Sequence, residues 1–144
     1  MKTNFAFWDT SGIVPLCCFQ ATSQTLRGLR RKYEVVAWWA SLIEAQSALK
    51  RLLEEKQISQ IAYDEAVKRL EIQSETWHEI LPTEKVREIT KTIIKNQNLR
   101  TLDAFQLAAA LVWCFEKPKG KIFVCCDDKL SEAARRIDFT VLPK

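Results

Sequence analysis

The sequence predicts one α/β domain, in which a central parallel sheet of about four strands is flanked by helices on both faces. Two observations favour this class. Short, almost uniformly apolar runs, typical of strands covered on both faces, alternate along the chain with longer segments of helical periodicity. The chain has 144 residues, 47% hydrophobic and 28% charged, so it can bury one core and is not expected to be disordered.

The expected order of elements is β-α-α-β-α-α-α-α-β-α-β. The four strands are the short apolar runs, at Phe5–Trp8, Glu34–Trp38, Lys121–Cys126 and Asp138–Leu142. The seven helices carry apolar residues three or four positions apart, and we expect them directly after Asp9 and at Gln24–Tyr33, Ser41–Leu53, Ser59–Leu81, Thr83–Asn96, Thr101–Phe115 and Asp128–Arg136.

Local signals set the boundaries of these elements. Gly12 ends a polar turn after the first strand, and Ser41 and Thr83 are suitable caps for the helices that follow them. Pro82 separates two helices of the middle region, and the sequence 117–120 is a turn. The helix at 101–115 is apolar almost all round, so we expect it to be buried.

The composition excludes several chemistries. The chain has 22 Lys plus Arg against 18 Asp plus Glu, a net charge of +4, which permits a phosphate-bearing partner without requiring one. One histidine and three dispersed glycines leave no histidine-based nuclease site, zinc centre or glycine-rich phosphate loop. Hydrolytic chemistry would therefore need carboxylates, a metal ion, or both.

The cysteines are expected to be buried thiols in a protein of the reducing cytoplasm. All five lie in apolar stretches without the spacing of a metal site, at Cys17, Cys18, Cys114, Cys125 and Cys126. The charge-poor stretch 3–26 is interrupted by polar residues and a proline, so it is a poor signal peptide, and no run reaches the ~18 apolar residues of a membrane span.

Three acidic residues stand alone in apolar surroundings. Asp9 is the only charged residue between Thr3 and Leu26, and Glu44 and Asp103 are equally isolated in their helices. A fourth acid, Asp127, directly follows the third expected strand. A buried carboxylate that is unpaired costs several kcal/mol to ionise, so each of these groups needs a partner, a proton or a cation.

The positions of the four acids allow them to converge. Asp9 and Asp127 follow strands, whose carboxyl ends share one edge of a parallel sheet, and Glu44 and Asp103 lie in the first turns of helices. Purely structural roles stay open: Asp9 and either Asp127 or Asp128 could cap helices, and Asp103 could interact with a helix dipole. Converging carboxylates repel one another unless a cation is bound, and oxygen-only ligands favour magnesium or manganese.

The motifs around these acids resemble those of PIN-domain ribonucleases, and most closely those of VapC toxins from type II toxin-antitoxin systems. The four matching segments run from the first strand to the last third of the chain, at Phe7-Trp8-Asp9-Thr10-Ser11, Ser41-Leu42-Ile43-Glu44, Arg100-Thr101-Leu102-Asp103-Ala104-Phe105-Gln106-Leu107-Ala108 and Phe123-Val124-Cys125-Cys126-Asp127-Asp128-Lys129-Leu130. The resemblance implies a single PIN-like domain over residues 1–144. It also implies a magnesium- or manganese-dependent endoribonuclease that acts as a cytoplasmic toxin, with a cognate antitoxin and a homodimeric state.

Carried over to this sequence, the resemblance implies that Asp9, Glu44, Asp103 and Asp127 are the catalytic and metal-binding set, with Ser11 as a supporting hydroxyl. By spacing Asp127 is the ligand, and Asp128 is then expected to cap the following helix. One position departs from the family: Cys125 stands where Thr or Ser is usual, two residues before the fourth acid. A thiol is the weaker hydrogen-bonding group, so reduced activity or metal affinity is expected.

Basic and aromatic residues offer further candidates. Arg27, Arg30, Arg31 and Arg100 could bind RNA phosphates, although a solvated helix face or, for Arg100, pairing with Asp103 would also explain them. Tryptophans could stack on bases but suit a core or an interface equally, at Trp38, Trp39 and Trp77. His78, expected on a helix surface, has no assigned role.

Two other function classes compete with the ribonuclease. One is a degenerate PIN-like domain that binds RNA or a protein without cutting. The other is a phospho-acceptor signalling domain built on Asp9, but the acidic pair at the first strand and the lysine ending a late strand that such a domain needs are not clear in this sequence.

Overall fold

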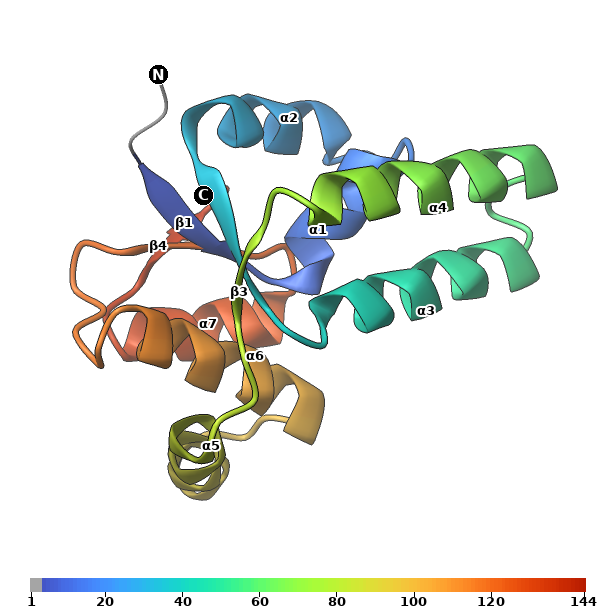
Figure 1. Cartoon of the computed structure of the whole chain (residues 1–144). Helices are drawn as coiled ribbons and strands as arrows, with labels where there is room; N and C mark the ends of the chain where they lie inside the picture. The colour runs from blue at the N-terminus through green and yellow to red at the C-terminus, as the bar shows by residue number, and fades with distance from the viewer. Residues whose placement is uncertain (1–3) are drawn as a thin grey trace.

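The computed structural model describes residues 4–144 and, within that range, contains a parallel five-stranded sheet and seven helices (Figure 1). The strands are β1 (Phe5–Trp8), β2 (Glu34–Trp38), β3 (His78–Ile80), β4 (Ile122–Val124) and β5 (Thr140–Leu142). The helices are α1 (Thr10–Cys17), α2 (Ser23–Lys32), α3 (Ser41–Glu54), α4 (Gln60–Ser74), α5 (Glu84–Asn96), α6 (Thr101–Trp113) and α7 (Asp128–Arg136). The predicted class is confirmed, with one strand more than expected.

All five strands are parallel, and the strand order β3-β2-β1-β4-β5 means that the direction in which strands are added to the sheet reverses beside β1. From β1 the chain adds β2 and β3 on one side, and it then returns to add β4 and β5 on the other. Right-handed crossovers in opposite directions put helices on opposite faces. Helices α1 to α4 accordingly cover one face and α5 to α7 the other (Figure 1).

Strand β1 is buried on both faces, which explains why its sequence is uniformly apolar rather than alternating. Phe7 faces the cluster under α5, α6 and α7, where its ring lies 5.5 Å from that of Phe123. Its neighbours Ala6 and Trp8 face the other cluster, under α1 to α4. The side chains of one short strand thus contribute to both cores.

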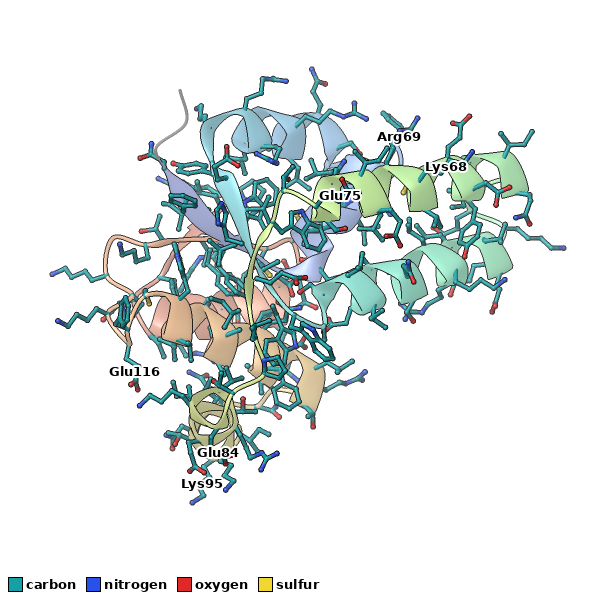
Figure 2. The ribbon with its side chains drawn as sticks, viewed as in Figure 1. Lys68, Arg69, Glu75, Glu84, Lys95 and Glu116 are labelled. Carbon is teal, nitrogen blue, oxygen red and sulfur yellow. The ribbon has the colours of Figure 1, made fainter. Side chains whose placement is uncertain are left out.

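The outer helices carry the charge. Helices α3 and α4 pack side by side and extend beyond the sheet as a helical hairpin (Figure 1). Figure 2 shows Glu84 and Lys95 projecting from α5 on the side away from the sheet. In residues 4–144 no helix is long and apolar enough to span a membrane.

The expected helix over Ser59–Leu81 is wrong in its last third. Helix α4 ends at Ser74, and His78–Ile80 forms the edge strand β3, paired in parallel with β2. Two of its three residues are exposed, so the sequence has no apolar run from which this strand could be predicted. Pairing with β2, a long-range contact, decides its conformation. His78 is on the surface as expected, and its ring lies edge-on against Phe5.

Other boundaries were predicted with smaller errors. Thr83 caps α5 as expected, whereas the N-cap of α3 is Ala40, and Ser41 is a buried residue inside the first turn. Helix α6 is not buried all round, since Leu102 is 59% exposed. The last two strands are shorter than expected. Strand β4 covers only Ile122–Val124 and is shorter at both ends, and β5 is shorter at its start, which is Thr140.

Candidate active site: a pocket with four carboxylates

The candidate site lies where β1 and β4 end side by side, at the reversal of strand order where α/β sheets commonly bind ligands. The amide of Asp9 donates to the carbonyl of Val124 at 2.9 Å, which ties the end of β1 to the end of β4. Gly12 allows this close approach, because a Cβ there would lie 3.0 Å from Cγ1 of Val124. Helix α1 can therefore start directly against β4.

All four predicted acids line one pocket of about 810 Å³ at this edge. They come from separate parts of the fold: Asp9 ends β1, Glu44 and Asp103 lie in the first turns of α3 and α6, and Asp127 ends the β4–α7 loop. The expectation that these side chains converge is therefore met by the geometry. Their use in metal binding and catalysis stays a prediction.

Asp9 is the most deeply buried of the four, at 5% exposure. Its Oδ2 accepts hydrogen bonds from the hydroxyl of Ser11 at 2.6 Å and from the Ser11 amide at 3.1 Å, so it is also the N-cap of α1. Burial raises the pKa of Asp9, and the hydrogen bonds from Ser11 oppose that rise. A capping role and a role in the pocket thus coexist in one side chain.

Ser11 connects the two loops that carry Asp9 and Asp127. Its hydroxyl donates to Asp9 and accepts from the amide of Cys126 at 2.8 Å. Cys125 lies behind them, with its Sγ 3.6 Å from both Oδ2 of Asp9 and the Ser11 hydroxyl. Burial and the nearby Asp9 charge raise the pKa of Cys125 to about 12, so this thiol stays protonated at neutral pH.

Glu44 is held by side chains of two other helices. Its Oε1 accepts from the hydroxyl of Thr10 at 3.1 Å and from Nε2 of Gln106 at 3.2 Å, while Oε2 is buried without a partner among the described residues. Burial raises the pKa of Glu44, the two hydrogen bonds oppose the rise, and the charges of Asp9 and Asp103 add to it. The acids therefore sense one another's charge.

Asp103 is affected by two neighbouring acids and by two cations. Burial raises its pKa first, and the charges of Asp127 and Asp9 raise it further. Arg100 and Lys129 lower it, so these are the basic side chains that act on the acidic cluster. Sequence reasoning singled out Arg100 but missed Lys129, whose signal was its place in the first turn after Asp127.

The fourth acid is a helix cap as well. Asp127, not Asp128, is the N-cap of α7, and its Oδ1 accepts from the amide of Leu130 at 3.0 Å. The expectation that Asp128 caps this helix is therefore wrong. Asp128 is instead the first residue of α7, and Asp127 satisfies the helix terminus while it lines the pocket.

The carboxylate oxygens of the pocket are the kind of ligand that a hard cation prefers, but they do not surround a single metal position. Within residues 4–144, no three His, Cys, Asp or Glu side chains lie close enough together to hold a metal ion by themselves. Glu44 nevertheless lines the pocket, and its Oε2 is buried without a hydrogen-bond partner among the described residues. Mg²⁺ is usually bound by one or two carboxylates and keeps several waters, so the observed arrangement fits that ion better than a fully protein-ligated one.

The arginines of α2 do not share this edge of the sheet. Arg30 contacts Glu34 at 3.7 Å and the Tyr33 carbonyl at 3.2 Å, at the start of β2 and thus at the opposite edge. Neither Arg27 nor Arg31 lines the pocket. Arg51 of α3 does line it, and the sequence gave no reason to single it out.

The tryptophans divide between core and surface. Trp38 is 5% exposed and its ring stacks on that of Phe105, and Trp77 is 9% exposed, so both serve the core. Trp39, at the end of β2, is 52% exposed and is the one of the three that a partner could reach.

Sequence reasoning also missed Thr10 and Gln106. Gln106 is completely buried and donates to Ser41, Thr10 and Glu44. The available signal was a single uncharged polar residue in an otherwise apolar helix, one turn after Asp103.

No protein-family model and no curated protein matches the sequence. Solved structures do share its fold. A toxin-antitoxin complex from Klebsiella pneumoniae contains a chain that aligns with a TM-score of 0.62 at 14% identity, over 86% of this chain and 88% of the other. PAE2754 from Pyrobaculum aerophilum aligns with a TM-score of 0.65 at 14% identity, over 96% and 90%.

FitAcB from Neisseria gonorrhoeae aligns over 96% of this chain and 97% of the other, with a TM-score of 0.66 at 15% identity. Similarity at such low identity establishes the fold and not the chemistry. The parallel five-stranded sheet with helices on both faces fits a PIN-like fold. The fold expected from the sequence is thus confirmed.

Proposed function

We propose that this chain is a metal-dependent endoribonuclease, formed by a single PIN-like domain over residues 1–144, and the toxin of a type II toxin-antitoxin system. The observation that carries the proposal is the convergence of Asp9, Glu44, Asp103 and Asp127 from four parts of the fold on one pocket. Burial raises the pKa of the first three, and charge repulsion adds to this for Glu44 and Asp103. Acids with raised pKa values gathered in one pocket are typical of functional sites, and a bound cation would offset their repulsion.

The four carboxylates would hold Mg²⁺ or Mn²⁺, with one or two bound directly and the others through water. The ion, when bound, polarises the phosphate, activates a water and stabilises the leaving oxygen. The protein's part is to orient these oxygens: Ser11 fixes Asp9, and Thr10 and Gln106 fix Glu44. No side chain of this chain needs to act as the nucleophile.

RNA would approach through its phosphates. Arg100 and Lys129 lie near enough to Asp103 to lower its pKa, so they are placed to offset the negative charge of the pocket toward a polyanion. Arg51, also on the pocket wall, could contact a phosphate further along the strand. These three replace the α2 arginines as our candidates for RNA binding.

A cognate antitoxin is the proposed protein partner. Beyond the acids the pocket continues along α1 and α3 over apolar side chains, at Val14, Pro15, Ile43, Ala48 and Leu52. An antitoxin segment with apolar residues and a basic residue would match both the apolar wall and the acidic end of the pocket, and it would block access to the acids. The structural similarity to a chain of a toxin-antitoxin complex supports this. We further propose a cytoplasmic location and a homodimeric state.

A second candidate is a PIN-like domain that binds RNA or a protein without cleavage. The observation that favours it is that no three acidic, histidine or cysteine side chains among residues 4–144 are grouped as metal ligands. Cys125, at the position usually occupied by a hydroxyl residue in PIN domains, points the same way.

The two candidates are separated by incubating the purified chain with a panel of structured and single-stranded RNAs. We expect cleavage with Mg²⁺ or Mn²⁺ and none with EDTA. Asp103→Asn keeps the size of the side chain and removes its charge, so it should reduce cleavage by about 100-fold or more, at or above the 10- to 100-fold that loss of an outer-shell partner of a metal typically costs.

Asp64→Asn is the matched control, because it makes the same change at an exposed position of α4 outside the pocket. It should cut like the wild type. Intact RNA in every metal condition, with RNA still bound, would favour the non-cleaving domain. Growth inhibition on expression, relieved by co-expression of a small protein encoded beside this chain, would support the toxin assignment.

A further inference from the structure

The side-chain amide of Gln106 is the centre of a buried network that joins three helices. Its Nε2 lies 3.0 Å from the hydroxyl of Ser41, 3.1 Å from that of Thr10 and 3.2 Å from Oε1 of Glu44. The nitrogen has two hydrogens, so it satisfies two of these acceptors at a time. The network connects α6 to α1 and α3 directly beneath the pocket.

Glutamine is an expensive choice at this position. The side chain is 0% exposed, and its neighbours on the buried face of α6 are Ala104, Leu107 and Ala110. Its Oε1 is buried without a hydrogen-bond partner among the described residues, and an unsatisfied buried acceptor destabilises the fold. An apolar side chain would pack here without that cost, so the amide needs another reason.

Glu44 differs from the two acids that cap helices. Asp9 and Asp127 accept hydrogen bonds from backbone amides of the helices they begin, at Ser11 and Leu130. The hydrogen bonds of Glu44 come instead from Thr10 and Gln106, which are 34 and 62 residues away in the sequence. No helix terminus fixes this carboxylate, so its orientation depends on remote side chains.

Both hydrogen bonds of Glu44 fall on the same oxygen. Thr10 and Gln106 both donate to Oε1, and Oε2 is left buried with no partner in the part of the chain that the structure describes. Two donors on one oxygen restrict rotation of the carboxylate and so fix its orientation, as outer-shell partners do for metal ligands.

We propose that Gln106 is a positioning residue that acts through Glu44: with Thr10 it holds Oε1 and thereby fixes the orientation of the Glu44 carboxylate, which lines the pocket where a cation would bind. This inference deepens the proposed function and rests on it for its consequence in catalysis. The amide itself touches neither the cation nor the RNA, and its contribution disappears when Glu44 can no longer serve as a ligand.

The test measures Mn²⁺ binding by isothermal titration calorimetry at neutral pH without RNA. Gln106→Leu removes the donors and keeps a similar volume, and we expect it to weaken Mn²⁺ binding by about 10- to 100-fold, as loss of an outer-shell partner does. In the Glu44→Gln background the same change should have no further effect. Gln106→His, which keeps a nitrogen donor at similar reach, should restore part of the affinity.

Gln73→Leu is the matched control. Gln73 is a partly buried glutamine of α4 that donates to the Leu16 carbonyl, outside the pocket. Its substitution should leave Mn²⁺ affinity unchanged. Wild-type affinity in Gln106→Leu, or an equal loss in the Glu44→Gln background, would overturn the proposal.

A separate measurement distinguishes this inference from the proposed function. If the wild type binds no Mn²⁺ and cuts no RNA, the proposed function fails. Urea unfolding of the metal-free single and double variants still tests the contact between Gln106 and Glu44. We expect the effect of Gln106→Leu on the unfolding constant to differ at least about threefold between the wild-type and Glu44→Gln backgrounds. Additive effects would show that Gln106 does not position Glu44.

Discussion

Helix α6 contributes to two regions with opposite physical character. Its later turns place Leu107 and the alanines at 108–110 in the apolar core beneath the sheet, where every contact favours the folded state. Its first turns place Asp103 at the pocket, with a raised pKa, and Gln106 in the buried network beneath it, with an unpartnered oxygen, and both features oppose the folded state. The core therefore stabilises the folded state, whereas the side chains of the pocket destabilise it.

This difference indicates what each region is for. A carboxylate that is desolvated and surrounded by like charge destabilises the fold unless something else compensates for it. Burial raises the pKa of three acids of the pocket, Asp9, Glu44 and Asp103, and the cation proposed above would compensate for this cost. We therefore expect substitutions in the core to lower stability, and substitutions in the pocket to affect function more than stability.

The largest effect on stability is expected in the core. Leu107→Ala should lower the free energy of unfolding by about 2–5 kcal/mol, because Leu107 is 0% exposed and the substitution leaves a cavity. Leu102→Ala, on the same helix at 59% exposure, is the matched control and should change it by less than about 0.5 kcal/mol. Urea unfolding measures both, and equal losses would contradict the division of α6.

In the pocket, unlike the core, we expect the wild-type side chain to lower the free energy of unfolding. A pH titration without divalent cations tests this at Asp9. Burial raises the pKa of Asp9 above its ordinary value of 3.8, so between the two values the folded state binds more protons than the unfolded chain. The free energy of unfolding therefore falls as pH rises through that window and stays lower above it.

Asp9→Asn should flatten this pH dependence and be more stable than the wild type at neutral pH, because asparagine can still cap α1. RNA cleavage by the same variant should be lost. Urea unfolding in EDTA at pH 4 and pH 7 gives the comparison. A variant that is less stable at pH 7, with an unchanged slope, would mean that Asp9 stabilises the fold as a charge.

A smaller effect is expected from the basic residues beside the acids. Arg100→Ala and Lys129→Ala should each weaken RNA binding several-fold and reduce the slope of log affinity against log salt concentration by about 1. Arg31→Ala, on α2 away from the pocket, is the control. Fluorescence anisotropy at several salt concentrations measures the slopes. A stronger loss for Arg31→Ala would restore α2 as the RNA-binding surface.

The smallest effect is expected at Cys125. Cys125→Ser places a stronger hydrogen-bond donor beside Asp9 and should raise Mn²⁺ affinity a few-fold, at most about tenfold. Cys114→Ser changes a buried thiol near the end of α6, outside the pocket, and should leave that affinity unchanged. Weaker Mn²⁺ binding by Cys125→Ser would indicate that packing of the larger sulfur matters more than its hydrogen bond.

Much of the fold could be predicted because its signals are local. The apolar runs of β1 and β2 and the periodicity of α3 and α5 are properties of neighbouring residues, and the structure follows them closely. Strand β3 could not be predicted in the same way, since its exposed His78 and Glu79 carry no such signal and its conformation comes from pairing with β2.

The acids of the site were predictable for a related reason. A lone carboxylate in an apolar element, such as Asp9 or Asp103, is conspicuous because burying it is costly. Its supporting residues were not conspicuous. Thr10 and Gln106 carry no charge, and their importance follows only from contacts across 34 and 62 residues.

By itself the sequence determined the α/β class, most of the helices and the acids at the ends of elements, since hydrophobic periodicity and isolated charge are written in adjacent residues. The tertiary structure decided which strands became neighbours, that Asp127 rather than Asp128 caps α7, and that Glu44 is held by Gln106. These outcomes depend on packing between segments distant in the chain, where one side chain's partner is fixed only when the helices and strands have assembled.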